Sequence, residues 1–194
     1  MEEKFADYGE VQIKQLNDRS KMYYTPNKEN NVFQLVVQYG AGEREFPKLG
    51  YAAQLMNNAG IMGAYEPQEF SKLNATCHVT ADDDYLYIIM EGYEATLPQA
   101  CQLLSRQILM PKLDEKQLAR LKGSAMGMRQ QRKDNVSILN EALRQYMLYG
   151  EKSDYIKEPT DKEIYELQIS ELTGDINRAS NYEAKVFSTG TLPF

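Results

Sequence analysis

Alternating apolar and polar residues predict several short β-strands. The clearest run covers Val32 to Tyr39, where Phe33, Leu35 and every second residue after them are apolar or aromatic. Glutamines at 34 and 38 fall on the opposite face, as in a strand with one buried side. Weaker runs at Val11–Leu16 and Met22–Tyr24 come first, and the polar segment 26–31 reads as a hairpin-like turn. Three later segments also read as strands: 77–81, 85–93 and 184–188.

Apolar residues at helical spacing dominate the rest of the chain. A helix is expected after Pro47, with Leu49, Ala52, Ala53 and Met56 inward and Gly60 and Gly63 ending it, and a short helix at Pro67. Later helices have N-terminal signals at Thr96–Gln99, Asp114, Asn135 and Thr160–Glu163. In the helix after Asn135 the apolar side is formed by Ile138, Leu139, Ala142 and Tyr146. After Thr160 the spacing predicts a pair of helices separated near Gly174.

This order of elements predicts the fold class. Strands come first, then helices, two strands, more helices and one last strand. The order indicates an α+β domain with a mostly antiparallel sheet and helices packed on one face. Linker composition and internal repeats are not evident, so one domain is expected.

Composition and charge exclude some functions. The 194 residues are 42% hydrophobic and 26% charged, with a net charge of −6, which argues against a nucleic-acid partner. The basic run of Arg129, Arg132 and Lys133 is interpreted as a solvated helix face. An apolar run of about 20 residues, long enough to span a membrane, is not present.

The residues that could carry chemistry are few. His78 is the only histidine, whereas a zinc hydrolase site usually draws on two or three. Cys77 and Cys101 lack the spacing of a metal or redox pair and are interpreted as buried free thiols. The three acids at 82–84 lack the glycine and distal glutamate of a calcium loop, so they are interpreted as a solvated hairpin turn.

Several motifs in order resemble a known family. Leu49–Asn57 is followed by a glycine-rich break and Pro67–Glu69, then by Pro111–Asp114 with Leu118 and Leu121, and finally by Gly190–Pro193. Together they resemble the M16 (insulinase/pitrilysin-type) zinc-peptidase family over residues 10–194, with 1–9 as an N-terminal extension. The resemblance implies an M16 peptidase-like, LuxS/metallohydrolase-like half-domain, expected to be a piece of a longer chain.

The same resemblance implies that the catalytic site has been lost. Active members carry His-x-x-Glu-His, whose two histidines share one helix face and hold zinc while the glutamate polarises a bound water. The matching positions here are Ala53, Met56 and Asn57, and the further glutamate of the family falls at Gly127, Met128 or Asp134, depending on the register. The resemblance therefore implies a domain that does not cut peptides, with no cofactor of its own and with zinc only in a catalytic partner domain.

Family members of this kind accompany a catalytic M16 half, in the same chain or as a separate subunit, and the two halves enclose a peptide. The resemblance thus implies a role as chamber wall and peptide-binding surface. An exposed strand edge could receive the peptide, and the candidate residues are Asn74, Ala75, Thr76, Cys77, His78 and Val79. A plain inner strand is the alternative for this segment.

Two other functions stay open. One is a scaffold subunit with no proteolytic role, which has precedent in this family. The other is a hydrolase that uses Cys77 or His78 with an acid from 82–84, which is disfavoured because adjacent strand residues point to opposite faces. The compartment is also open: periplasmic or secreted if the parent chain carries a signal peptide, and cytoplasmic otherwise.

Overall fold

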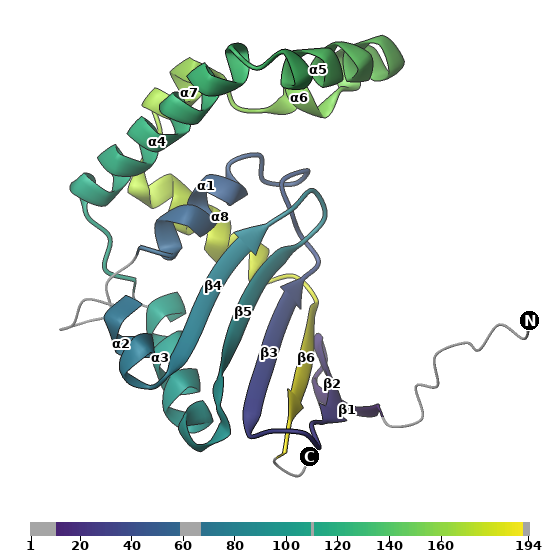
Figure 1. The fold of residues 1–194 in the computed structure, drawn as a ribbon, viewed down its shortest axis with the longest axis vertical. Helices are drawn as coiled ribbons and strands as arrows, with labels where there is room; N and C mark the ends of the chain where they lie inside the picture. Colours follow the sequence, from purple (N-terminus) through teal and green to yellow (C-terminus); the bar gives the residue numbers. More distant parts are fainter. Residues whose placement is uncertain (1–10, 59–66, 110, 192–194) are drawn as a thin grey trace, which may run out of the picture.

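A six-stranded sheet forms the centre of the molecule. The structure is a computed structural model, and it describes residues 11–58, 67–109 and 111–191. The strand order is β1-β2-β6-β3-β5-β4, so β1 and β4 lie at the edges (Figure 1). Neighbouring strands are antiparallel except β2 and β6, which are parallel. The strands are β1 (Gln12–Asn17), β2 (Ser20–Pro26), β3 (Val32–Tyr39), β4 (Ala75–Ala81), β5 (Leu86–Tyr93) and β6 (Ala184–Gly190).

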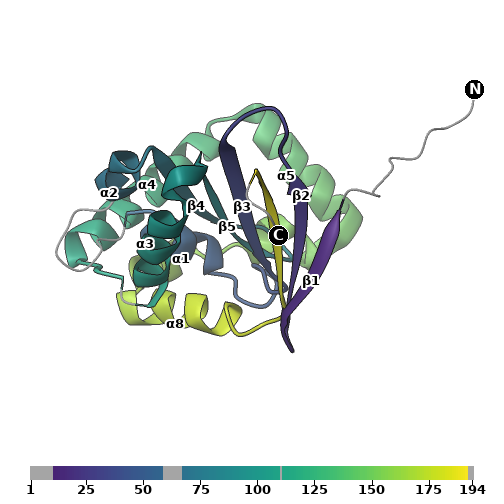
Figure 2. The same ribbon diagram turned by 90° about the horizontal axis from the view of Figure 1, so that it is seen from below.

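The helices form two groups. Helices α1, α3 and α8 lie against one face of the sheet (Figure 2), and α2 contacts the edge strand β4. Helices α4 to α7 form an arm beyond one end of the sheet (Figure 1). The helices are α1 (Leu49–Met56), α2 (Pro67–Lys72), α3 (Leu97–Leu109), α4 (Glu115–Lys133), α5 (Val136–Tyr149), α6 (Asp154–Lys157), α7 (Asp161–Tyr165) and α8 (Ile169–Ala179), with 3-10 turns η1 (Glu94–Thr96) and η2 (Gly150–Lys152). The predicted α+β class, with a mostly antiparallel sheet and helices on one face, is confirmed.

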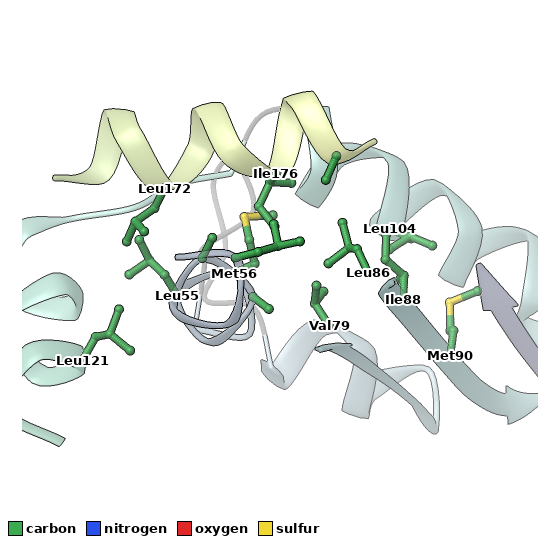
Figure 3. Close-up of a cluster of buried hydrophobic side chains, with 14 of the residues drawn as sticks. Leu55, Met56, Val79, Leu86, Ile88, Met90, Leu104, Leu121, Leu172 and Ile176 are labelled. Carbon is green, nitrogen blue, oxygen red and sulfur yellow. The ribbon is translucent and has the colours of Figure 1, made fainter. Parts of the chain in front are cut away.

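One hydrophobic core joins the sheet to its helices. Leu86, Ile88 and Met90 alternate along β5 with residues that face away, as a strand with one buried side requires. The helices contribute stripes that include Leu104 of α3 and Ile176 of α8 (Figure 3). Full burial of each such side chain stabilises the fold by roughly 1.5–3 kcal/mol, so this layer contributes much of the stability.

All four predicted helices begin where expected, including α3 at Leu97, and three of the four predicted caps form. Asp114 and Gln117 form a reciprocal capping box at the start of α4, and Thr160 and Glu163 form another at α7. Asn135 accepts from two backbone N–H groups at the start of α5. Thr96 instead lies in η1, and its hydroxyl donates to the carbonyl of Tyr93 at 2.8 Å.

The helix break predicted near Gly174 is wrong. Gly174 lies inside α8, and the chain leaves helical geometry earlier, between Tyr165 and Ile169. A helical glycine costs about 1 kcal/mol relative to alanine. Burial of Leu172, Ile176 and Ala179 on the same helix outweighs that cost. The expected break at Gly60 and Gly63 lies outside the described residues.

Helix α5 begins where the sequence predicted, after Asn135. The spacing predicted a helix after Asn135 with Ile138, Leu139, Ala142 and Tyr146 on one side, and α5 is present, but none of its residues is buried. Leu139 and Tyr146 are 42% and 50% exposed. The helix belongs to the arm, where only α4, α6 and η2 make extensive contacts with it. Periodicity predicted the helix and its apolar side, and the structure adds that the protein core does not cover this side.

Candidate functional site

The three motif positions lie on α1, against the sheet. Ala53 and Met56 are 1% and 2% exposed and belong to the core cluster with Val79 and Ile176 (Figure 3). The helical spacing had placed both on the inward face. A methyl group and a thioether at these positions fill space between α1, β4 and α8, and neither is a ligand that zinc prefers. This part of α1 is built as core.

Asn57, at the C-terminal end of α1, has a different role. Its side-chain amide donates to the carbonyl oxygen of Val79 at 2.8 Å, and its side-chain oxygen accepts from the backbone N–H of Val79 at 2.7 Å. These are the two bonds that a neighbouring strand would make. The Asn57 carboxamide therefore pairs with the edge strand β4 as a one-residue surrogate strand.

The same end of α1 is held from a second direction. Gln107 of α3 is buried, and its side-chain amide donates to the carbonyl of Met56 at 3.0 Å. Since the last carbonyls of a helix lack partners within the helix, this bond satisfies one of them. Together, Asn57 and Gln107 fix α1 between β4 and α3.

The candidate peptide-binding segment forms most of β4, which is an edge strand. Asn74 precedes the strand with a positive φ of 50°. Ala75 and Val79 are buried on the helix side, whereas Thr76 and His78 are exposed on the other face. Whether a peptide binds here stays a prediction.

The contact with Asn57 shows which backbone N–H and C=O groups of β4 point away from β5. Both polar backbone groups of Val79 point away from β5, because Asn57 binds them. Residues two apart in a strand direct these groups to the same edge, so Cys77 also points its N–H and C=O outward. The edge is occupied at Val79, and Cys77 is the next position that could pair with an added strand.

Cys77 and His78 do not form a reactive pair. The Cys77 side chain packs against the core, and burial raises the pKa of its thiol to about 12. His78 lies on the opposite face beside Ile89. Asp82 accepts from the backbone N–H groups of Asp84 and Tyr85 at the hairpin turn. These groups are not brought together as a nucleophile, base and acid.

A cavity of about 700 Å³ lies between α1 and α4. Its lining includes Tyr51 and Gln54 of α1, Ala125 and Met128 of α4, and residues of the 43–50, hairpin and 157–159 segments. Met128 is one of the three positions at which the family's further glutamate could fall. In the described ranges no cluster of three or more His, Cys, Asp or Glu side chains could hold a metal ion.

Charged side chains at the cavity wall are paired. Arg129 lies 2.6 Å from Asp161, and Arg132 makes two hydrogen bonds to Glu158 at 2.8 and 2.9 Å. The prediction of a solvated basic face is therefore wrong for Arg129 and Arg132. Their carboxylate partners lie about 30 residues later, which a local reading of the helix could not show. This network ties α4 to α7 and the loop before it.

Two ionisable side chains that line the cavity, Glu43 and Tyr51, have raised pKa values. Burial raises the pKa of Glu43, and the nearby charge of Asp83 raises it further, although the N–H of Gly50 opposes the shift. Burial also raises the pKa of Tyr51, against the opposing effect of Arg129. Glu43 lies outside the motifs found in the sequence, and Tyr51 lies within the Leu49–Asn57 segment, where nothing in the pattern distinguishes it as a cavity residue.

The chain is similar in structure to several solved proteins. By sequence, it matches no family model and no curated protein. The peptidase M16 inactive domain from Pseudomonas fluorescens superposes with a TM-score of 0.79 at 21% identity, over 94% of this chain and 47% of that one. The ferredoxin protease FusC, solved with Arabidopsis ferredoxin, gives a TM-score of 0.82 at 14% identity, over 97% and 22% of the two chains.

A third solved protein also has a similar structure. The periplasmic protease PqqL from Escherichia coli superposes with a TM-score of 0.78 at 11% identity, over 97% of this chain and 23% of that one. The chain thus spans about half or less of the length of each of these proteins. No helix in the described residues combines the length and apolar character needed to cross a membrane. From the strand order to the helices on one face, the chain has the α+β fold of M16-type peptidase domains.

Proposed function

We propose that the chain is a non-catalytic M16-type domain that supplies chamber wall and peptide-binding surface to a catalytic half, in the same chain or as a separate subunit. The observation that supports the proposal is what the side chains at the motif positions of α1 contact. The positions that resemble the zinc motif serve packing and strand pairing: Ala53 and Met56 are in the core, and Asn57 binds Val79. A framework that is kept without its catalytic groups is useful through its surface.

The edge of β4 supports a peptide-binding role. An extended peptide can add to an exposed edge through main-chain hydrogen bonds, and its alternate side chains then enter neighbouring pockets. Cys77 directs its backbone groups to this edge, whereas Asn57 has taken those of Val79. An added strand would therefore pair with β4 at Cys77 and end before Val79.

The proposal also names a class of substrate and places the zinc in the catalytic half. FusC was solved in complex with a ferredoxin, which supports a protein or peptide segment as the class of substrate. Zinc and peptide hydrolysis belong to the catalytic half. This domain would position the substrate, which contributes through orientation.

The test is reconstitution. A catalytic M16 half is assayed against a mixed peptide pool, alone and with this domain, and the domain should increase peptide turnover. Cys77→Pro removes one outward N–H from an edge strand, where proline is tolerated, and should abolish much of the increase. Cys77→Ala removes the thiol but keeps that N–H, so it should retain the increase.

Two results would contradict the proposal. Equal turnover with and without the domain would remove the chamber role. Equal loss in both Cys77 variants would locate the effect in the side chain and leave strand addition without support. Circular dichroism and thermal melting of each variant separate a loss of function from a loss of fold.

A further inference from the structure

The cavity between α1 and α4 contains a carboxylate that has no cationic partner. Glu43, Asp83 and Glu158 all line this cavity. Asp83 lies 3.3 Å from the guanidinium of Arg44, and Glu158 lies 2.8 Å from that of Arg132. Within residues 11–58, 67–109 and 111–191, by contrast, Glu43 forms no ion pair. Its charge is therefore free to bind a cation that enters the cavity.

The start of α1 holds the side chain of Glu43 in place. The backbone N–H of Gly50 donates to this carboxylate. Gly50 lies in the first turn of α1, where the N–H groups have no partner inside the helix. A Cβ at position 50 would overlap the Oε1 atom of Glu43, so glycine provides the space for this contact. The carboxylate is thus positioned before a ligand binds.

The charges that act most strongly on Glu43 are negative. Burial raises the pKa of its carboxyl, and the charges of Asp83, Glu158 and Asp82 raise it further. The electrostatic potential at this point of the cavity is therefore negative. A half-buried carboxylate without a partner is costly, and a bound cation would remove part of that cost.

The rest of the cavity wall suits an aliphatic chain. Tyr51 comes from α1, Ala125 and Met128 come from α4, and Pro47 and Pro159 complete the apolar part of the lining. Long cationic side chains pack their methylene groups on such surfaces, and a tyrosine ring attracts a cation. The cavity volume of about 700 Å³ lies within the range of roughly 300–1,000 Å³ that is typical of ligand pockets.

We propose that this cavity binds a lysine or arginine side chain of a peptide, with the cationic group at Glu43 and the aliphatic part against Tyr51 and Met128. The inference rests on the proposed peptide-binding role and adds the class of residue that the domain selects. An acidic side chain would be repelled by Glu43. A neutral side chain would leave its carboxylate without a counter-charge.

Binding of single blocked amino acids to the whole chain tests the proposal without a catalytic half. Nα-acetyl-arginine amide and Nα-acetyl-lysine amide are titrated while the amide resonance of Gly50 is followed by NMR. Both should bind with dissociation constants on the order of 1–10 mM. The citrulline analogue replaces the guanidinium by a neutral group of similar shape, so it should bind about tenfold more weakly or worse.

Three variants locate the binding site. Glu43→Gln removes the charge but keeps an oxygen for the N–H of Gly50, and it should weaken binding of the arginine probe by about tenfold or more. Gly50→Ala displaces the carboxylate and should also weaken binding, without lowering the melting temperature, since alanine is the better helix former. Asp84→Asn is the matched control.

The control removes a nearby negative charge that is not part of the cavity wall. Asp84 lies in the β4–β5 hairpin turn, where its carboxylate is 2.5 Å from Arg44 and about half exposed. Exposed charges are screened by salt, so Asp84→Asn should change the dissociation constant by less than about twofold. Thermal melting of each variant separates a loss of binding from a loss of fold.

Three results would overturn the proposal. Equal affinity for the arginine and citrulline probes would show that the charge of the ligand is not recognised. Equal affinity of Glu43→Gln and the parent chain would place the cation elsewhere. Binding of Nα-acetyl-glutamate amide as tightly as the arginine probe would show that the cations of the wall select the ligand instead.

The same probes separate this inference from the proposed function. If the domain does not increase the turnover of a catalytic half, the chamber role fails, while binding of the arginine probe that depends on Glu43 still supports the cavity site. If the domain increases turnover equally for peptides that contain arginine and for matched peptides that contain citrulline, the peptide-binding role stands and the cation site fails.

Discussion

Replacing Asn57 by alanine removes both hydrogen bonds that join α1 to the edge of β4. The bonds, 2.8 and 2.7 Å long, satisfy the carbonyl and the N–H of Val79, whose side chain is buried. A hydrogen bond contributes about 1 kcal/mol net, and an unsatisfied buried group costs 1–3 kcal/mol. Because Asn57 is only half-buried, water can replace part of the loss. We expect the free energy of unfolding to fall by about 2 kcal/mol.

The assay is thermal and urea unfolding followed by circular dichroism. For 194 residues the entropy of unfolding is about 0.4 kcal/mol per kelvin, so the melting temperature should fall by about 5 °C. Asn58→Ala is the control. The exposed Asn58 side chain donates to the carbonyl of Gln54 at 2.9 Å, and alanine keeps the backbone bonds of this residue, so the substitution should cost less than about 0.5 kcal/mol.

A second variant tests the donor and the acceptor separately. Asn57→Asp keeps the acceptor for the N–H of Val79 but loses the donor to its carbonyl. A protonated carboxyl can donate there, so the folded state should raise the pKa of this carboxyl. Its stabilising contact is then present at low pH and lost as pH rises through the folded pKa. The stability deficit of Asn57→Asp should therefore shrink below about pH 4. Equal stability of Asn57→Ala and Asn58→Ala would refute this reasoning.

Four further predictions follow from the core, the cavity wall and the motif positions. Met56→Asp should destabilise by about 3–5 kcal/mol in urea, because it buries an unpaired charge, whereas Gln54→Asp on the exposed side of α1 should cost below about 1 kcal/mol. The raised pKa of Cys77 should make its alkylation by iodoacetamide slow at pH 8 in the folded chain and fast in urea; equal rates would contradict burial of the thiol. The hydrogen bond from Arg129 lowers the pKa of Asp161, so the stability that this pair contributes is present above the unfolded pKa and lost as pH falls. Asp161→Asn should therefore reduce the free energy of unfolding at neutral pH and flatten the decline of stability in acid. Parallel curves of stability against pH for variant and parent would argue against the pairing. Elemental analysis after dialysis should find far less than one zinc per chain, and a stoichiometric zinc would show that another set of ligands exists.

Local patterns in the sequence predicted much of the fold. The alternation from Phe33 to Tyr39 gave the bounds of β3, and Asp114, Asn135 and Thr160 marked three helix starts. These signals succeed because the physics is local: a side chain caps a helix two or three residues away, and a buried strand face repeats every second residue.

Long-range partners could not be read in this way. Nothing near Asn57 indicates that its amide pairs with Val79, and a polar residue at the end of a helix normally faces water. The basic residues Arg129 and Arg132 looked solvated because their carboxylate partners come later in the chain. In α5 the period identified an apolar stripe but not what covers it. Each miss concerns the partner of a residue, which periodicity does not encode.

The position of β6 has a consequence for how the chain folds during synthesis. This strand is the last described element, and it lies between β2 and β3, so it alone joins the β1–β2 hairpin to the rest of the sheet. Until residues 184–190 have been made, the hairpin has no neighbour and the inner edge of β3 is open. A two-stranded hairpin is marginal by itself, and pairing across about 160 residues is slow. Nascent chains halted before Ala184 should therefore be cut readily by protease within β1 and β2, and protection there should appear only when the final strand is added.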